Sequence, residues 1–134
     1  MDISSFDDFL AAARQQTQPQ RLLFAFAHAE LPENPTPEQK AVFAAGQGGA
    51  LVPSVCVDKT LDELSTFAAF VEESRPFSLD WVIVFAAGLP GRDGQLPSAG
   101  DAEEPLKRMV AMIRAGDIQA LLPFNRQGEP VRLG

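Results

Sequence analysis

The stretch that decides the fold is RLLFAFAHA, residues 21–29. It is apolar at every position between Leu22 and Ala27, with no polar residue before His28. A strand with one face in water alternates apolar and polar residues, so an unbroken apolar run is typical of a strand that is covered on both faces. We therefore predict a strand here, at the centre of a sheet.

Segments on both sides of this run carry alternating helix and strand patterns. In residues 6–16, apolar side chains recur at the i, i+3, i+4, i+7 spacing of one helical face. Capping boxes predict helices that open after Thr36 and after Thr60, the first stopping at Gly46 and the second ending before Pro76. The other predicted elements are strands at 50–57, 80–88 and 119–124, and a helix that contains Leu106, Met109, Val110 and Ile113 and stops at Gly116.

The order of these elements predicts the fold class. Strands that alternate with helices call for crossover connections, which join parallel strands in a helix-covered sheet. We therefore predict a single α/β domain over residues 1–134, with a C-terminal hairpin and a mostly parallel or mixed sheet of roughly four to five strands. Proline cannot donate to a strand ladder, so Pro53 and Pro123 place the second and fourth strands toward the edges, with the first and third in the middle.

Composition excludes several functional classes. Hydrophobic residues make up 46% of the chain and charged residues 22%, and no apolar run reaches the roughly 20 residues of a membrane-spanning helix. The formal net charge of −7 repels nucleic acid, and one cysteine with one histidine cannot form a zinc site. The N-terminus is acidic and has no secretory pattern. We expect a cytoplasmic protein with no metal, no nucleic-acid partner and no membrane partner.

Polar side chains follow the predicted strands at the points where the strands end. In open α/β sheets, ligands bind beyond the carboxyl ends of parallel strands, where the loops converge. These strand ends give one candidate ligand-binding rim, which consists of His28, Cys56, Asp58, Lys59, Arg92 and Arg126. The rim exists only if the strands run parallel.

Cys56 is the only cysteine and has two interpretations. As a nucleophile it needs a base or a cation nearby, which His28 or Lys59 supplies if the first two strands are neighbours. As a strand residue between Val55 and Val57, it is a small apolar filler, which is the usual role of a free cysteine. We favour the second interpretation and assign no catalytic residue.

The glycine-rich segment GLPGRDG, residues 88–94, follows the third predicted strand and includes the cation Arg92. It lacks the lysine signature of a P-loop and the spacing of a dinucleotide-binding turn, and the next predicted helix starts several residues later. We interpret it as a surface loop and predict no cofactor.

Three segments carry a family resemblance: QRLLFAFAHAELP at 20–32, GGALVPSVCVDKTLDEL at 48–64 and LLPFNRQGEPV at 121–131. Through them the chain resembles a small family of uncharacterised bacterial proteins, some of whose members are labelled ribonucleotide reductase alpha subunit. The resemblance implies a cytoplasmic location in a Gram-negative bacterium. The label conflicts with the residues, because such reductases use a large barrel, a radical-bearing cysteine and a redox-active cysteine pair, whereas this chain has Cys56 alone. No catalytic residue is therefore carried across.

These observations favour a non-catalytic binding or interaction module, either an accessory to a larger enzyme or a homodimer. Its acidic surface suits a basic protein partner. Two alternatives stay open. One is a small thiol-dependent enzyme that uses Cys56 with His28 or Lys59. The other is an anion- or nucleotide-binding protein, accessory to nucleotide metabolism, whose rim cations are Lys59, Arg92 and Arg126.

Overall fold

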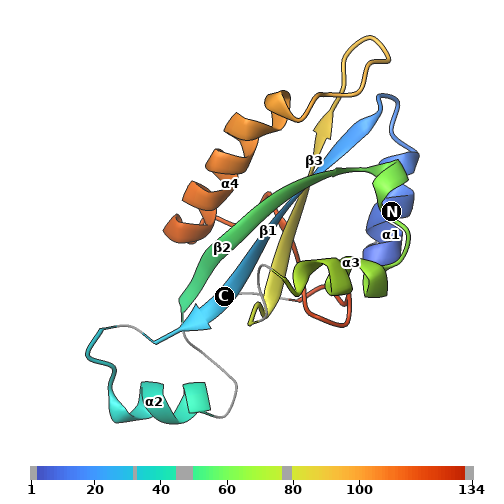
Figure 1. The fold of residues 1–134 in the computed structure, drawn as a ribbon. Coiled ribbons are helices and arrows are strands. Elements are labelled where there is room, and N and C mark those ends of the chain that lie inside the picture. Colours follow the sequence, from blue (N-terminus) through green and yellow to red (C-terminus); the bar gives the residue numbers. More distant parts are fainter. Residues whose placement is uncertain (1–2, 32, 45–49, 77–79, 132–134) are drawn as a thin grey trace.

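The fold is built on an antiparallel sheet that helices cover on both faces (Figure 1). The computed structural model describes residues 3–31, 33–44, 50–76 and 80–131. Within these residues the sheet has four strands: β1 at Gln20–Glu30, β2 at Ala50–Thr60, β3 at Ile83–Pro90 and β4 at Leu122–Phe124. Their order across the sheet is β2-β1-β3-β4.

The predicted strand direction is wrong. In the described part of the chain every pair of neighbouring strands is antiparallel, whereas the sequence led us to expect a mostly parallel or mixed α/β sheet. The crossover rule does hold for β2 and β3, which run in the same direction and are connected through a helix. However, β1 lies between them and runs the opposite way. The other two helix-containing connections, β1 to β2 and β3 to β4, join antiparallel strands, so alternation of helix and strand fixes neither the direction of the strands nor which of them are neighbours.

β1 occupies the centre of the sheet, as predicted, and both of its faces meet the core. Leu22, Phe24 and Phe26 point to one face and Leu23, Ala25 and Ala27 to the other, and all are at most 3% exposed. The run has no polar member because neither face reaches water. The prediction that the first and third strands are central and the second and fourth peripheral is confirmed.

Two helices, α1 (Phe6–Arg14) and α3 (Phe67–Ser74), cover the first face. Ser5 caps α1 and Thr66 caps α3, each by accepting a hydrogen bond from a backbone amide of the first turn. Phe6 lies in the middle of the aromatic cluster beneath them, where its ring meets those of Phe9, Phe24, Phe67, Phe70 and Phe124. This cluster joins both helices to the sheet.

The opposite face is covered by α4 (Glu103–Ala115), which lies over β1 and β2 (Figure 1). Met109 and Ile113 are its buried side chains. Pro105 sits in the first turn, where no amide hydrogen is needed, and Gly116 ends the helix, as predicted, in the left-handed conformation (φ 77°). No helix in the described ranges, α4 included, has the length and hydropathy needed to cross a bilayer.

The position of α2 (Pro37–Ala44) explains why β1 and β2 are antiparallel neighbours. The helix opens with the predicted capping box, in which Thr36 and Gln39 exchange hydrogen bonds. Yet it has no buried residue and projects beyond the end of the sheet (Figure 1). The segment between the two strands is therefore a long excursion within a hairpin and not a crossover. The predicted stop at Gly46 lies outside the described residues.

The helix predicted after Thr60 is interrupted. Thr60 and Glu63 do form the predicted capping box, but the helix they start is a single 3-10 turn, η1, at Leu61–Glu63. Leu64 is extended (φ −105°, ψ 124°), and Thr66 then caps α3 as a separate helix. Two N-cap threonines a few residues apart therefore give two helices where one was predicted.

A tight hairpin follows β3 and positions the loop that leads to α4. Asp93 (φ 53°) and Gly94 (φ 77°) are the central residues of a turn of the I′ kind, in which Arg92 and Gln95 exchange both backbone hydrogen bonds. The backbone of Gln95 comes so close to Gly91 that only glycine fits there, because a Cβ would lie 1.9 Å from the Gln95 carbonyl oxygen. The segment interpreted as a plain surface loop is an ordered turn.

The C-terminal segment forms the predicted hairpin, but its returning part pairs with β4 over only a short stretch. After β4 the chain turns at residues 125–129, where Gly128 has a positive φ of 77°. It returns at Pro130 in an isolated bridge to Phe124, and the Val131 amide donates to the Pro123 carbonyl oxygen at 3.0 Å. The segment PVRL, residues 130–133, is the expected returning strand of this hairpin, and its residues 132 and 133 lie outside the described residues.

Candidate functional site

The antiparallel sheet divides the predicted rim between two ends of the molecule. β2 and β3 both end where β1 begins, since Thr60 pairs with Arg21 and Pro90 pairs with Gln20. β1 and β4 run the opposite way and end at the far side of the sheet. The single rim that parallel strands would have formed is therefore not present.

The six rim residues fall into three places. Asp58, Lys59 and Arg92 lie at the end where β2 and β3 finish. We call this end of the sheet the polar end. The opposite end holds His28 and Arg126. Cys56 lies between the two ends, in the middle of β2 and opposite Ala25.

At the polar end, Asp58 and Lys59 face opposite sides of the sheet, because neighbouring residues of a strand alternate. Asp58 forms an ion pair with Arg21 at 2.6 Å. Lys59 points to the face that carries α3, where its Nζ lies 2.9 Å from Glu73 Oε2. Each of the two predicted rim charges is thus already neutralised by a partner.

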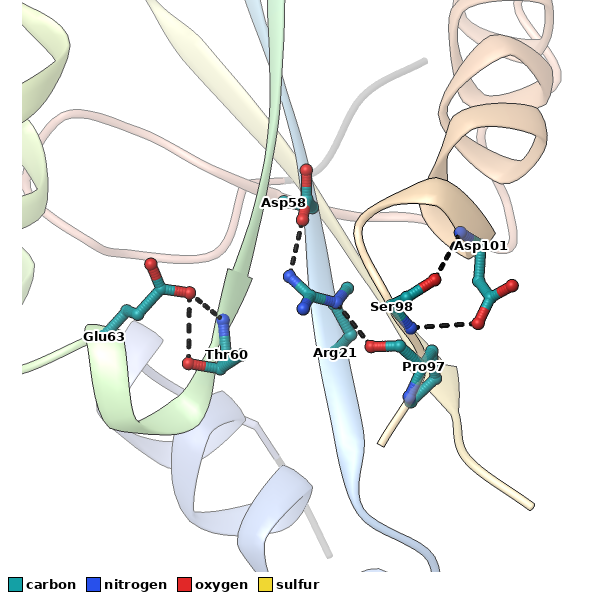
Figure 2. A network of polar contacts seen from close by, with 7 residues as sticks. All are labelled: Arg21, Asp58, Thr60, Glu63, Pro97, Ser98 and Asp101. Atoms are coloured by element: carbon teal, nitrogen blue, oxygen red, sulfur yellow. Dashed lines mark hydrogen bonds and ion pairs between the residues drawn. The ribbon is translucent and has the colours of Figure 1, made fainter. Parts of the chain in front are cut away.

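Arg21 lies at the centre of the polar end (Figure 2). Its Nη1 donates to Asp58 Oδ2 at 2.6 Å, and its Nε donates to the Pro97 carbonyl oxygen at 2.7 Å. The side chain is only 13% exposed. Arg21 therefore ties β2 to the loop between β3 and α4, and Figure 2 shows it between the two.

The same loop carries a capping box of its own, formed by Ser98 and Asp101, which borders a pocket. The Ser98 amide donates to Asp101 Oδ2 at 2.9 Å, and the Asp101 amide donates to Ser98 Oγ at 3.1 Å (Figure 2). The Ser98 amide above all, and then the Ser98 side chain, lower the pKa of the Asp101 carboxyl and favour its anionic form. The pocket beside it has a volume of about 460 Å³, with Arg92 and Asp101 in its lining. The two charges offset each other, so the pocket attracts an anion only weakly.

Cys56 is a partly buried side chain in the core beneath α4. It packs against the buried cluster that includes Ala25 and Met109. Burial raises the pKa of its thiol above the ordinary value, so less thiolate is present at neutral pH. Neither suggested activator lies beside it, because His28 pairs with Val52 further along β2 and Lys59 faces the other side of the sheet.

We expect the folded protein to react with iodoacetamide at Cys56 at least about tenfold more slowly at neutral pH than the denatured chain does. Burial restricts access and the raised pKa keeps the thiol protonated, so the rate is expected to rise only at a pH above the usual range for cysteine. Mass spectrometry of time points across a pH series measures it. Fast alkylation at pH 7, with a half-maximum below the ordinary pKa, would instead support the thiol-enzyme hypothesis.

At the opposite end of the sheet, His28 and Arg126 each contact a neighbouring residue of the folded chain. His28 Nε2 lies 2.7 Å from Glu30 Oε1 on the same strand. Arg126 donates to the Trp81 carbonyl oxygen at 3.0 Å, and its guanidinium carbon lies 4.8 Å from the centroid of the Trp81 ring. Arg126 thereby holds the C-terminal turn against the segment that leads into β3. We therefore assign His28 and Arg126 a structural role.

β2 is an edge strand with one side open. Its inner side pairs with β1, and within the described residues no backbone group outside this ladder bonds to the backbone of residues 55–59. Pro53 and a register shift opposite Phe26 and Ala27 interrupt its first half, which hinders pairing with another chain there. The second half, residues 55–60, pairs regularly and has no proline. It offers a row of backbone donors and acceptors to another extended chain.

A groove lies beside this open half, between β2 and α3. Its volume is about 260 Å³, and Phe26, Val57 and Phe70 form its apolar wall. The ion pair between Lys59 and Glu73 reaches from β2 to α3 at its rim. An open strand edge next to an apolar groove is the arrangement by which peptide-binding domains add a strand to their sheet.

Sequence reasoning missed the residues that α3 contributes to this groove. Pro53 placed β2 at an edge, but Phe70 and Glu73 join the groove only through the packing of α3 on the sheet. A signal for the open half did exist. Residues 55–60 mix two valines with Asp58 and Lys59, which is typical of a half-buried edge strand and differs from the unbroken apolar runs of β1 and β3.

Other kinds of site receive no support from the described residues. Among them, no group of three or more His, Cys, Asp or Glu side chains is arranged to hold a metal ion. Comparisons with protein-family models, curated proteins and solved structures found no match. The open half of β2 and the pocket beside Arg92 are therefore weighed by their geometry and charge alone.

Proposed function

We propose that this chain is a non-catalytic interaction module that binds an extended segment of a partner polypeptide along the open half of β2. The observation that carries the proposal is the regular edge at residues 55–59, to which no backbone group outside the β1 ladder bonds within the described residues, directly beside the groove at Val57 and Phe70. A strand added there satisfies its backbone hydrogen bonds on β2 and places alternate side chains toward the groove.

Three features favour binding over catalysis. The Cys56 thiol is partly buried and its pKa is raised, which opposes a role as nucleophile. Asp58 and Lys59 are engaged in ion pairs and thus already have partners. The pocket beside Arg92 is the alternative site for a small anion, but the Asp101 carboxylate reduces its attraction for one. A cytoplasmic location is part of the proposal, because a lone free cysteine suits a reducing compartment.

Amide hydrogen exchange tests this function directly. Peptides of about ten residues are selected from a random library on the full chain, and exchange is followed by NMR with and without the tightest peptide. We expect amides at alternate positions of residues 55–59 to exchange quickly in the free protein and at least about tenfold more slowly in the complex. The alternation arises because neighbouring amides of a strand point to opposite sides, and only the outer side of β2 is open.

Two matched variants locate the binding surface. Val57→Asn places an amide in the groove and is expected to weaken the selected peptide about tenfold or more. Val82→Asn makes the same change at a side chain that is 41% exposed and outside the groove, so we expect no effect on affinity. Equal losses for the two variants would contradict the proposal, as would peptides that protect only residues 89–97 beside Arg92.

A further inference from the structure

The charges around the open half of β2 indicate the chemistry of its partner, an inference that rests on the proposed function. Three ion pairs neutralise their charges here: Arg21 with Asp58, Lys59 with Glu73, and Arg75 with Glu72. Asp62 and Glu63 follow β2 directly in η1 and form no ion pair within the described residues. The end of the open half therefore carries two carboxylates that form no direct ion pair, although Lys59 and Arg21 act on Glu63 from further away.

Hydrogen bonding by Thr60, the last residue of β2, favours the charged form of the Glu63 carboxyl. The Thr60 amide donates to Glu63 Oε1 at 2.9 Å and the Thr60 hydroxyl lies 3.1 Å from the same oxygen (Figure 2). These bonds, the one from the amide first, lower the pKa of the Glu63 carboxyl. Asp62 is exposed next to it. A cation brought to this place meets negative charge at every pH near neutrality.

The groove sets a second requirement, near the middle of the open half. Val57 lies at its wall together with Phe26 and Phe70, all apolar, and the charges of Lys59 and Glu73 at the rim neutralise each other. A volume of about 260 Å³ admits one large apolar side chain. Burying such a side chain removes apolar surface from water and favours binding.

We infer that the partner segment is an extended strand with one large apolar side chain, which enters the groove at Val57, and a lysine or arginine at the end that lies beside Asp62 and Glu63. The bulge at Pro53 limits the paired stretch to residues 55–60, about 20 Å of strand at 3.3 Å per residue. Charge also favours this partner over a second copy, because two chains of net charge −7 repel each other and a basic segment is attracted.

Synthetic peptides test the two requirements separately. The first probe is a β-forming peptide of about eight residues with a central leucine and a terminal lysine; the second has glutamate for the lysine, and the third has alanine for the leucine. Fluorescence anisotropy with the full chain measures their affinities at low and high salt. We expect the glutamate peptide to bind at least about tenfold more weakly at low salt, with a smaller difference at high salt. We expect a loss of roughly tenfold or more for the alanine peptide.

A pair of charge-matched variants places the cation. Asp62→Lys is expected to abolish the preference for the lysine peptide, whereas Asp117→Lys changes the net charge equally at an exposed site beyond α4 and is expected to leave the preference intact. The charge inference is overturned if both variants change the preference for the lysine peptide equally, or if the lysine and glutamate peptides bind equally. In that case, protection of the β2 amides from exchange still supports the proposed function.

Two further results separate the remaining cases. Protection of residues 55–60 without any peptide, together with a dimer in sedimentation, would identify a second copy as the occupant and overturn the inferred partner. A monomer in which no selected peptide protects β2 would overturn the proposed function itself, and the inference with it.

Discussion

Replacing Phe6 by alanine is expected to lower the free energy of unfolding by about 3–5 kcal/mol. Phe6 is 1% exposed, and the centroids of the neighbouring phenylalanine rings lie 4.8 to 6.0 Å from that of Phe6. Those rings come from α1, β1, α3 and β4, so they cannot all move to fill the cavity. Denaturant unfolding followed by the fluorescence of Trp81, the single tryptophan, measures the loss. Since a domain has about 5–15 kcal/mol in total, the variant is expected to be marginally folded.

Phe43→Ala provides the matched control. Phe43 lies in α2, a helix with no buried residue, so we expect a loss below about 1 kcal/mol. The two variants remove the same side chain and differ only in its surroundings. Losses of equal size would contradict the assignment of Phe6 to the middle of the core.

Local structure was largely predictable because its causes are local. The capping box at Thr36 and Gln39 and Gly116 after a last turn both act over a few residues, and each appears as predicted. The break between η1 and α3 was missed since the pattern of Leu61, Leu64 and Phe67 fits one helix as well as two. Burial of β1 on both faces followed from its unbroken apolar run.

Strand direction was not predicted, because a helix between two strands does not fix whether they run the same way: α4 covers a face of the sheet, yet the strands it connects, β3 and β4, are antiparallel. α4 has buried residues four positions apart, Met109 and Ile113, and it covers a face. In α2 the apolar residues 41–44 are consecutive and do not form one stripe, so the helix has no face to bury against a sheet. That difference was readable from the sequence. Treating both helices as crossovers produced the parallel sheet and, with it, the single rim of six residues.

For the candidate site, the sequence predicted only that β2 is an edge strand. Pro53 indicated an edge, and the edge is where the open half of β2 lies. Arg21 gave no signal, because one cation before an apolar run is usually a solvated strand end. Its partners Asp58 and Pro97 are far away in the sequence and meet it only in the folded chain. Contacts of this kind need the strand register, which the hydrophobic pattern alone does not supply.

Replacing Arg21 by alanine is expected to cost about 2–3 kcal/mol of unfolding free energy. The Asp58 carboxylate, 24% exposed, loses the ion pair at 2.6 Å, and the Pro97 carbonyl oxygen loses the donor at 2.7 Å. We place the loss below that for a fully buried pair, because water still reaches both side chains. Denaturant unfolding measures the change, and hydrogen exchange is expected to quicken in residues 97–101, which the contact to Pro97 anchors.

Arg92→Ala is the control at the same end of the molecule. Arg92 is exposed and forms no ion pair within the described residues, so its replacement is expected to change stability by no more than about 0.5 kcal/mol. A double-mutant cycle of Arg21→Ala with Asp58→Ala is expected to give a coupling energy of about 1–2 kcal/mol. A coupling near zero would mean that Arg21 acts through Pro97 alone. If the Arg21 and Arg92 variants are equally stable, the polar end does not depend on Arg21, and the contacts that join β2 to the loop before α4 contribute nothing to folding.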